Sequence, residues 1–274
     1  MRVVSLLSIL CGLFCGLGAW PGGVAPAAAA PTSVYLEELT WTEVRDAVKA
    51  GVTTIILPVG GTEQNGPQMA LGKHNARARV LAGRIAAALG DTLVAPVVAY
   101  VPEGNISPPS GHMRYPGTIS ISDAAFRGLL EGAARSFRHA GFLHVVLIGD
   151  HGGYQNDLKE VAAALNREWA GSPARAHFID AYYKVTQTEY VRALRARGLS
   201  DAAIGSHAGA ADTSLTMAID PSMVRTDKLD SAGGNATGIS GDPRGSSAAL
   251  GQLGVDQIVT GTVAAIRKAR QERP

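Results

Sequence analysis

The chain has 274 residues, of which 46% are hydrophobic and 18% are charged. This apolar fraction excludes a disordered chain, which needs low hydrophobicity and high net charge. The formal charge is only +2 and only 5% of residues are aromatic, so we expect no nucleic-acid partner. The length suits one large α/β domain.

The first thirty residues have the pattern of a secretory signal. A single charge, Arg2, precedes an apolar run over residues 3–20, and small residues follow up to Ala30. A membrane anchor is the alternative, but the glycines within the run favour cleavage. We therefore predict a signal peptide over residues 1–30 and an exported, periplasmic or secreted mature domain over residues 31–274, which makes no membrane contact after cleavage.

Both cysteines, Cys11 and Cys15, lie inside this predicted signal. The mature chain then has no thiol, although it enters an oxidising compartment. A metal site in it must be built from His, Asp, Glu and water.

After residue 30, buried strands and amphipathic helices are predicted to alternate. The Thr40–Glu43 pair has capping-box spacing, which predicts a helix beginning there. Helices are expected over residues 40–50, 76–89, 123–140, a stretch following the turn at 149–154, 189–197, and one or two over 247–270. Strands are expected over residues 53–59, 92–101, 144–148 and about 177–182.

This alternation predicts an α/β fold, a three-layer α/β/α sandwich with a mostly parallel sheet. Ligand sites of such folds lie outside the carboxyl ends of the strands. Acidic and histidine side chains gather in four segments at such positions: Glu63 and His74, Glu103 and His112, Asp150 and His151, and His207 and Asp212.

Other site chemistries fit these segments less well. The glycine spacing at 61–66 resembles a phosphate loop, but Pro67 and Gln68 replace the required Lys and Ser or Thr. No G-x-S-x-G nucleophile motif is present. Each carboxylate or histidine alone could be solvated, cap a helix or bind a loop carbonyl. Their coincidence on four loops indicates a metal site.

Five motifs in order resemble those of the creatininase family. They read LPVGGTEQNGP…LGKHN from Leu57, SGHMRYPGTISI from Ser110, IGDHGGYQ from Ile148, HAGAADTSLTMAI from His207 and GISGDPRG from Gly238. The resemblance implies a creatininase-like sandwich, often hexameric, that hydrolyses cyclic or linear amide C–N bonds. It also implies a divalent metal centre, frequently of two ions that share a carboxylate.

Residue by residue, the resemblance retains Glu63 and His151 as metal ligands. The histidine of the family's E-x-H motif falls on Asn65, and its bridging aspartate falls on His74. The glutamate of the family's HAG-x-x-E motif falls on Asp212. A neutral imidazole has one lone pair and cannot bridge two ions as a carboxylate can. We therefore expect one ion rather than two, bound by Glu63, His74 and His151, with Asp212 as a fourth ligand or as the base.

The expected metal is zinc, with manganese or iron as alternatives. A water activated by the ion would attack the carbonyl of a small-molecule amide. His112 or His207 would donate a proton to the leaving nitrogen. The alternative is a non-catalytic protein of the same fold that binds a small ligand. A homo-oligomer, a hexamer by resemblance, is expected in either case.

Overall fold

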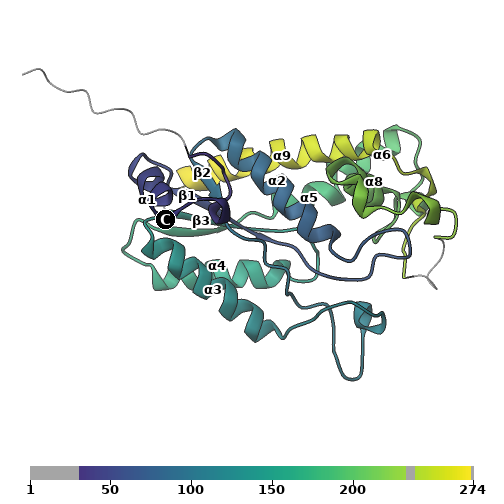
Figure 1. The fold of residues 1–274 in the computed structure, drawn as a ribbon, viewed down its shortest axis with the longest axis horizontal. Helices are drawn as coiled ribbons and strands as arrows, with labels where there is room; N and C mark the ends of the chain where they lie inside the picture. Colours follow the sequence, from purple (N-terminus) through teal and green to yellow (C-terminus); the bar gives the residue numbers. More distant parts are fainter. Residues whose placement is uncertain (1–30, 233–237, 273–274) are drawn as a thin grey trace, which may run out of the picture.

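The fold is built on a sheet of four parallel strands in the order β2-β1-β3-β4 (Figure 1). The computed structural model describes residues 31–232 and 238–272, so the predicted signal peptide lies outside the described residues. The strands are β1 (Thr54–Val59), β2 (Thr92–Val94), β3 (His144–Gly149) and β4 (Arg175–Phe178). Residues of β1 pair in register with both β2 and β3.

One α-helix precedes the first strand, and α-helices follow each of the four strands. They are α1 (Trp41–Lys49), α2 (Lys73–Leu89), α3 (Asp123–His139), α4 (Gln155–Glu168), α5 (Ala181–Gln187), α6 (Glu189–Ala196), α7 (Asp201–Ile204), α8 (Ala210–Ile219) and α9 (Ala248–Gln271). The predicted capping box at Thr40 and Glu43 is present and starts α1. None of the described helices combines the length and hydropathy needed to cross a bilayer.

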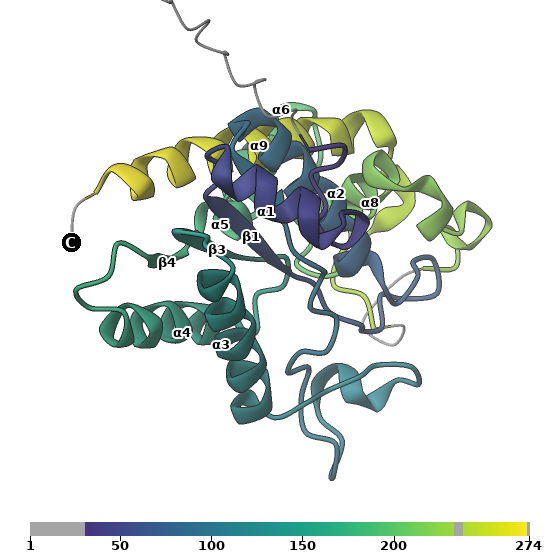
Figure 2. The same cartoon turned by 60° about the vertical axis from the view of Figure 1, so that its left-hand side comes forward.

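The sheet is covered on both faces, as its uninterrupted apolar strands require. Ile55 and Leu57 point into one core, shared with α3 and α4, while Ile56 points into the other, shared with α2, α5 and α9. Figures 1 and 2 show these two helical layers on opposite sides of the strands. The predicted three-layer sandwich with a parallel sheet is confirmed.

Two strands and one helix differ from their predicted bounds. The strand predicted over residues 92–101 ends at Val94, because Pro96 has no N–H; beyond it, Val98 still donates to the carbonyl of Pro58 at 3.0 Å. The strand predicted at 177–182 lies earlier, as β4, and α5 begins at Ala181. Helix α2 begins at Lys73, three residues before its predicted start.

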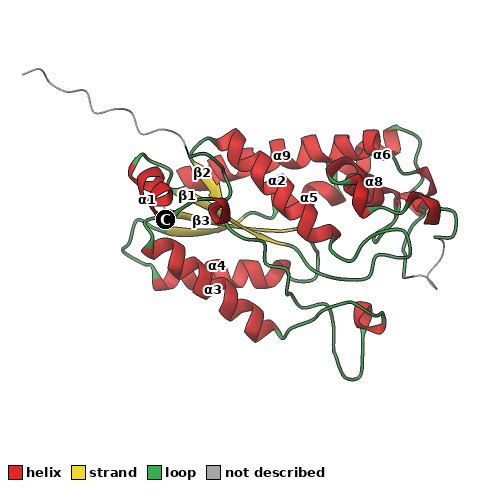
Figure 3. Cartoon of the chain, in the orientation of Figure 1, coloured by secondary structure: helices red, strands yellow, loops and turns green. Residues whose placement is uncertain are grey.

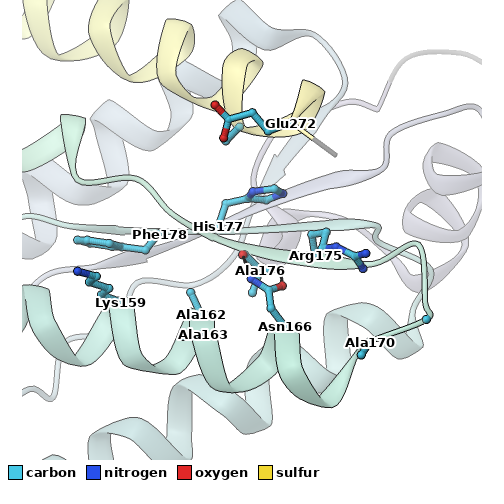
Figure 4. A pocket seen from close by; sticks show the side chains of 12 residues that line it. Lys159, Ala162, Ala163, Asn166, Ala170, Arg175, Ala176, His177, Phe178 and Glu272 are labelled. Carbon is cyan, nitrogen blue, oxygen red and sulfur yellow. Dashed lines mark hydrogen bonds between the residues drawn. The ribbon is translucent and has the colours of Figure 1, made fainter. Parts of the chain in front are cut away.

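The free edge of β4 is closed by a side chain. Asn166 of α4 donates to the carbonyl of Ala176 at 2.8 Å and accepts from its N–H at 2.9 Å, as a neighbouring strand would. A groove of about 760 Å³ runs along this edge between α4 and the end of α9. In Figure 4, His177 points from β4 toward Glu272.

Long loops, green in Figure 3, leave the carboxyl ends of the strands on one side of the sheet. The loop after β1 carries Glu63 and leads into α2. The segment after β2 carries Glu103 and a 3-10 helix, Gly111–Arg114. The turn after β3 carries His151. These loops place the polar side chains predicted from the sequence at one edge of the sheet.

Candidate metal centre

Four side chains from three loops converge at this edge. Glu63, Glu103, His112 and His151 each offer a ligand atom, and these atoms all lie within 4.8 Å of one another. The Nε2 of His151 lies 3.8 Å from Oε2 of Glu63, and the Nε2 of His112 lies 3.1 Å from the same oxygen. Two carboxylates and two imidazoles are a donor set suited to a divalent transition metal.

The two carboxyl groups of this cluster are buried, and three of their four oxygens have no hydrogen-bond donor among the described residues. Their side chains have no exposed surface. Across the described part of the chain, Oε2 of Glu63 and both carboxyl oxygens of Glu103 accept no hydrogen bond. Burial, together with the negative charge of Glu63, raises the pKa of Glu103 to about 9. A buried, unpaired carboxylate is costly, and a cation bound among these oxygens would remove that cost. The residues present therefore fit a metal ion.

A glycine allows Glu103 to approach the loop after β1. Gly61 has a φ of +148°, and a Cβ there would lie 2.8 Å from Oε1 of Glu103. The N–H of Gly61 donates to Oδ1 of Asn75 at 3.0 Å, which fixes this backbone against α2. Any larger residue at position 61 would push the carboxylate out of the cluster.

Tyr154 fixes the turn that carries His151. Its buried hydroxyl accepts from the N–H of His151 at 3.0 Å and lies 2.6 Å from the carbonyl of Gly60, to which it donates. The turn after β3 is thereby tied to the end of β1. Burial lowers the pKa of His151 to about 3, so the ring is neutral and keeps a lone pair for a metal.

Hydrogen bonds with Gln64 determine which ring nitrogen carries the proton in His112 and in His207. Its Nε2 donates to Nδ1 of His112 at 2.8 Å and to the carbonyl of Gly238 at 2.9 Å, while Nε2 of His207 donates to the Gln64 carbonyl at 3.0 Å. Because Nδ1 of His112 accepts, the neutral ring carries its proton on Nε2, toward Glu63. Burial lowers the pKa of both histidines, that of His207 to about 4.

His74 lies beside the cluster, but its two ring nitrogens face carboxylates. Nε2 lies 2.7 Å from Oε1 of Glu63, and Nδ1 lies 2.6 Å from Oδ2 of Asp150. Only a ring with a proton on each nitrogen can donate to both, and such a ring has no lone pair for a metal. Glu63, His74 and His151 thus lie close together, and in this structure His74 is a hydrogen-bond partner of Glu63. Their role as metal ligands stays a prediction.

Asp212, predicted as a fourth ligand or as the base, has both carboxyl oxygens engaged by cations in this structure. Its Oδ2 accepts from Nζ of Lys73 at 2.7 Å, and its Oδ1 accepts from Nη1 of Arg77 at 2.8 Å. Although burial alone would raise the pKa of Asp212, these two cations hold it well below its usual range. A carboxylate held this way is a weak base. It anchors Lys73 and Arg77.

A similar balance between burial and neighbouring positive groups keeps the Glu63 carboxylate ionised. Burial acts to raise its pKa, but the hydrogen bond from His74 and the charges of His74 and Lys73 outweigh burial and lower it. Asn65, where the family has a histidine, donates to the carbonyls of Glu63 and Ala70 at 2.9 and 3.1 Å. These two hydrogen bonds stabilise the loop that follows β1.

Sequence reasoning placed Glu103 on the correct loop but did not select it as a ligand, and it did not identify Lys73 or Arg77. Glu103 directly follows Pro102 and precedes Gly104, in a loop that also carries His112. That neighbourhood was the available signal. For Lys73 the signal would have been the earlier start of α2, which turns the side chain inward.

Comparison with known proteins agrees with this site. Residues 37–266 match the family described as creatininase, creatinine amidohydrolase. The chain belongs to the creatininase family. It is 29% identical to the mycofactocin precursor peptide peptidase of Mycolicibacterium smegmatis, over 81% of this chain and 87% of that protein. It is 28% identical to the creatinine amidohydrolase of Pseudomonas putida, over 72% of this chain and 76% of the relative.

Solved creatininase structures share the fold. One titled "Creatininase Mn" matches with a TM-score of 0.73 at 25% identity, over 88% of this chain and all of that one. A mutant creatininase described as the Zn-Zn type matches with a TM-score of 0.72, also at 25% identity, over 88% of this chain and 99% of that one. The predictions of family, fold and a hydrolase of amide C–N bonds are confirmed, and these metal-containing relatives agree with the metal-binding cluster.

Proposed function

We propose that this creatininase-family chain is an exported amidohydrolase that cleaves a C–N bond of a small cyclic or linear amide at one divalent ion. Zinc is the expected metal, and manganese or iron the alternatives. The observation that carries the proposal is a pair of buried carboxyl groups, Glu63 and Glu103, three of whose four oxygens accept no hydrogen bond from the described residues, beside two neutral histidines. This arrangement is costly without a cation and favourable with one.

Glu63, Glu103 and His151 are the ligands we propose. Oε2 of Glu63 is the oxygen left free by His74, and the neutral ring of His151 stands within 3.8 Å of both carboxylates. When bound, the ion would polarise the amide carbonyl and activate a water for attack. Glu63 and His151 were also ligands in the set predicted from the sequence. Glu103 replaces His74 as the third ligand of the proposed set.

His112 is the proposed general acid. Gln64 holds its Nδ1 as an acceptor, which leaves the proton on Nε2, the nitrogen that faces the cluster. That proton can pass to the leaving nitrogen as the C–N bond breaks, while the ring takes up the proton that the attacking water loses, so that the imidazole is neutral before and after the step. His207 is held at its Nε2 by the Gln64 carbonyl, so it positions Gln64 and, through it, His112.

The substrate enters from the side on which the histidines are exposed. The side chains of His112, His151 and His207 are 26%, 20% and 15% exposed, whereas the carboxylates are fully covered. A small amide can therefore reach the imidazoles and the open side of the ion. The relatives' names give a precursor peptide and creatinine, and a mutant creatininase is solved with creatine. Both linear and cyclic amides are thus candidate substrates.

Export is the part of the proposal that depends on residues 1–30. Its support is the charge, apolar run and small-residue order described above. Mass spectrometry of the periplasmic fraction should find a chain that begins near residue 31. An intact chain in the membrane fraction would contradict cleavage. The homo-oligomer stays a prediction from family resemblance, which gel filtration with light scattering would test.

Glu103→Gln tests the metal-dependent reaction. The variant keeps the shape of the side chain but removes a carboxylate ligand, so we expect the purified protein to lose most of its zinc and its amidase activity. Glu160→Gln, at an exposed glutamate of α4, is the matched control and should retain both. Metal content is measured by mass spectrometry, and activity by amine release from a panel of cyclic and linear amides.

The same experiment separates the enzyme from the non-catalytic alternative. A wild-type protein that binds no zinc, manganese or iron, hydrolyses none of the amides, but still binds one of them would support a ligand-binding protein of the creatininase fold. Activity that survives complete removal of metal by a chelator would contradict the proposed role of the ion.

A further inference from the structure

Asp150 is a buried carboxylate that the proposed reaction does not use. It follows the last residue of β3 and directly precedes His151, and its side chain is only 1% exposed. A charge buried to this extent is retained only where positive or proton-donating groups compensate it. In this chain one of those groups is His74, which also contacts Glu63.

Contacts from three elements fix the Asp150 carboxylate. Its Oδ1 accepts from the hydroxyl of Tyr182 on α5 at 2.9 Å, and its Oδ2 accepts from Nε of Arg77 on α2 at 2.8 Å. Its own N–H donates to the carbonyl of Val59, at the end of β1, at 3.0 Å. Burial acts to raise the pKa of Asp150, but the charge of Arg77 and the hydrogen bond from His74 lower it below its usual range. The carboxylate is therefore ionised and held in one orientation.

His74 connects this fixed carboxylate to Glu63. Nδ1 of His74 lies 2.6 Å from Oδ2 of Asp150, and Nε2 lies 2.7 Å from Oε1 of Glu63. Both neighbours are acceptors, so the ring donates to both only when each of its nitrogens carries a proton. Its side chain is 4% exposed, so the two carboxylates, rather than water, determine how the ring is turned.

Glu63 is thereby presented to the cluster with one free oxygen. Oε1 accepts from His74, while Oε2 accepts no hydrogen bond within residues 31–232 and 238–272 and faces His112 and His151. Nζ of Lys73 lies 3.6 Å from Oε1, which is beyond hydrogen-bond distance. His74 is therefore the group that fixes the rotation of the Glu63 carboxylate.

We propose that Asp150 is a positioning residue of the metal centre, which acts through His74 to turn Glu63 so that Oε2 alone faces the ion. The proposal rests on the proposed metal-dependent function and adds to it a residue that contacts neither the ion nor the substrate. Without the negative charge of Asp150, the His74 ring would not be held with a proton on each nitrogen, and its contact with Oε1 would be lost. Partners that orient a metal ligand in this way contribute roughly 10- to 100-fold to metal affinity.

The zinc affinity of Asp150→Asn tests this role. The amide keeps the size of the side chain and can still accept a hydrogen bond, but it carries no charge. We expect the dissociation constant for zinc, measured by competition with a chromophoric chelator, to rise roughly 10- to 100-fold while circular dichroism shows an intact fold. Asp256→Asn, at an exposed aspartate of α9, is the matched control and should bind zinc as the wild type does. An unchanged dissociation constant in folded Asp150→Asn would overturn the proposal.

The double variant shows whether Asp150 acts through His74. His74→Gln should itself weaken zinc binding, and adding Asp150→Asn to it should cause no further loss, because the connection to Glu63 is already broken. If Asp150→Asn weakens zinc binding as much in the His74→Gln background as in the wild type, Asp150 acts on the fold or on His151 instead, and the proposal is wrong.

Nitrogen NMR of the histidine rings tests the same role on the wild type, without any variant. We expect both ring nitrogens of His74 to be protonated before and after zinc is added. An unprotonated nitrogen in the zinc-free protein would overturn the proposal, and an Nε2 that loses its proton when zinc is added would make His74 a ligand instead. A wild type that binds no zinc would contradict the metal-dependent function, and the role of Asp150 would fall with it. Zinc binding that is equal in the wild type and Asp150→Asn would contradict only the role of Asp150.

Discussion

At the scale of single residues, the site depends on how Glu63 divides its two oxygens. Oε1 is committed to His74 and lies beside Lys73, and Oε2 is left for a metal. The sequence shows that the family's bridging aspartate is replaced by His74, which suggests a single ion. It does not show that His74 hydrogen-bonds to Glu63, because metal binding and hydrogen bonding would use the same ring nitrogens.

His112→Gln tests the proton donor. The amide can still hydrogen-bond with Gln64, but it carries no proton that can pass to a leaving nitrogen. We expect the rate constant kcat to fall by roughly 10²- to 10⁴-fold, the usual contribution of a general acid. Because His112 is not one of the three proposed ligands, we expect the variant to keep its metal.

Measuring bound metal as well as kcat distinguishes a proton donor from a metal ligand at position 112. His139→Gln, at an exposed histidine at the end of α3, serves as the control with unchanged kcat and metal content. If His112→Gln loses the metal together with activity, His112 is a ligand and the assignment of the proton donor is wrong.

At the scale of elements, sequence patterns predicted most helices and the two central strands to within a few residues. Capping at Thr40 and the β-branched runs of β1 and β3 are local signals, so they can be read directly. The start of α2 is not local. Gly72 offers no side-chain cap, and the buried ion pairs of Lys73 and Arg77 extend the helix toward the loop.

The edge strand β4 carries a pH-dependent contribution to stability. His177 contacts His144 of β3 at 3.1 Å, and burial, followed by the charges of His144, Arg270 and Arg175, lowers the pKa of His177 to about 4. In the unfolded chain that pKa is about 6.5. Glu272 lies across the groove from His177 (Figure 4).

This shift fixes the sign of the pH effect. Above about pH 6.5, His177 is neutral in both states and its contribution is complete. As the pH falls from about 6.5 to about 4, the unfolded chain takes up a proton that the folded chain refuses, so the free energy of unfolding decreases. We expect His177→Asn to make this decrease less steep, as measured by urea unfolding at a series of pH values.

His139→Asn is the matched control, because His139 is exposed on α3 and should leave the pH dependence unchanged. Parallel pH profiles for the wild type and His177→Asn would show that His177 does not titrate differently in the folded and unfolded states.

At the scale of the whole molecule, the parallel sheet brings the functional loops together. The loops after β1, β2 and β3 leave the same edge of the sheet. Glu103 and His151, which come 40 and 88 residues after Glu63 in the sequence, therefore both reach Glu63. The sequence predicted this convergence from the positions of these residues after successive strands of a parallel sheet. Which carboxylate faces the metal depends on close packing at Gly61 and on buried charges, and these are properties of the folded chain.

The central claim is that one ion binds among Glu63, Glu103 and His151. Crystals grown with zinc and measured at the zinc absorption edge test it most directly. The account predicts a single anomalous peak per chain, bonded to Oε2 of Glu63, to Glu103 and to His151, with Nζ of Lys73 on the opposite side of Glu63. Two peaks that share Glu63, or one peak bonded to His74 and Asp212, would contradict it.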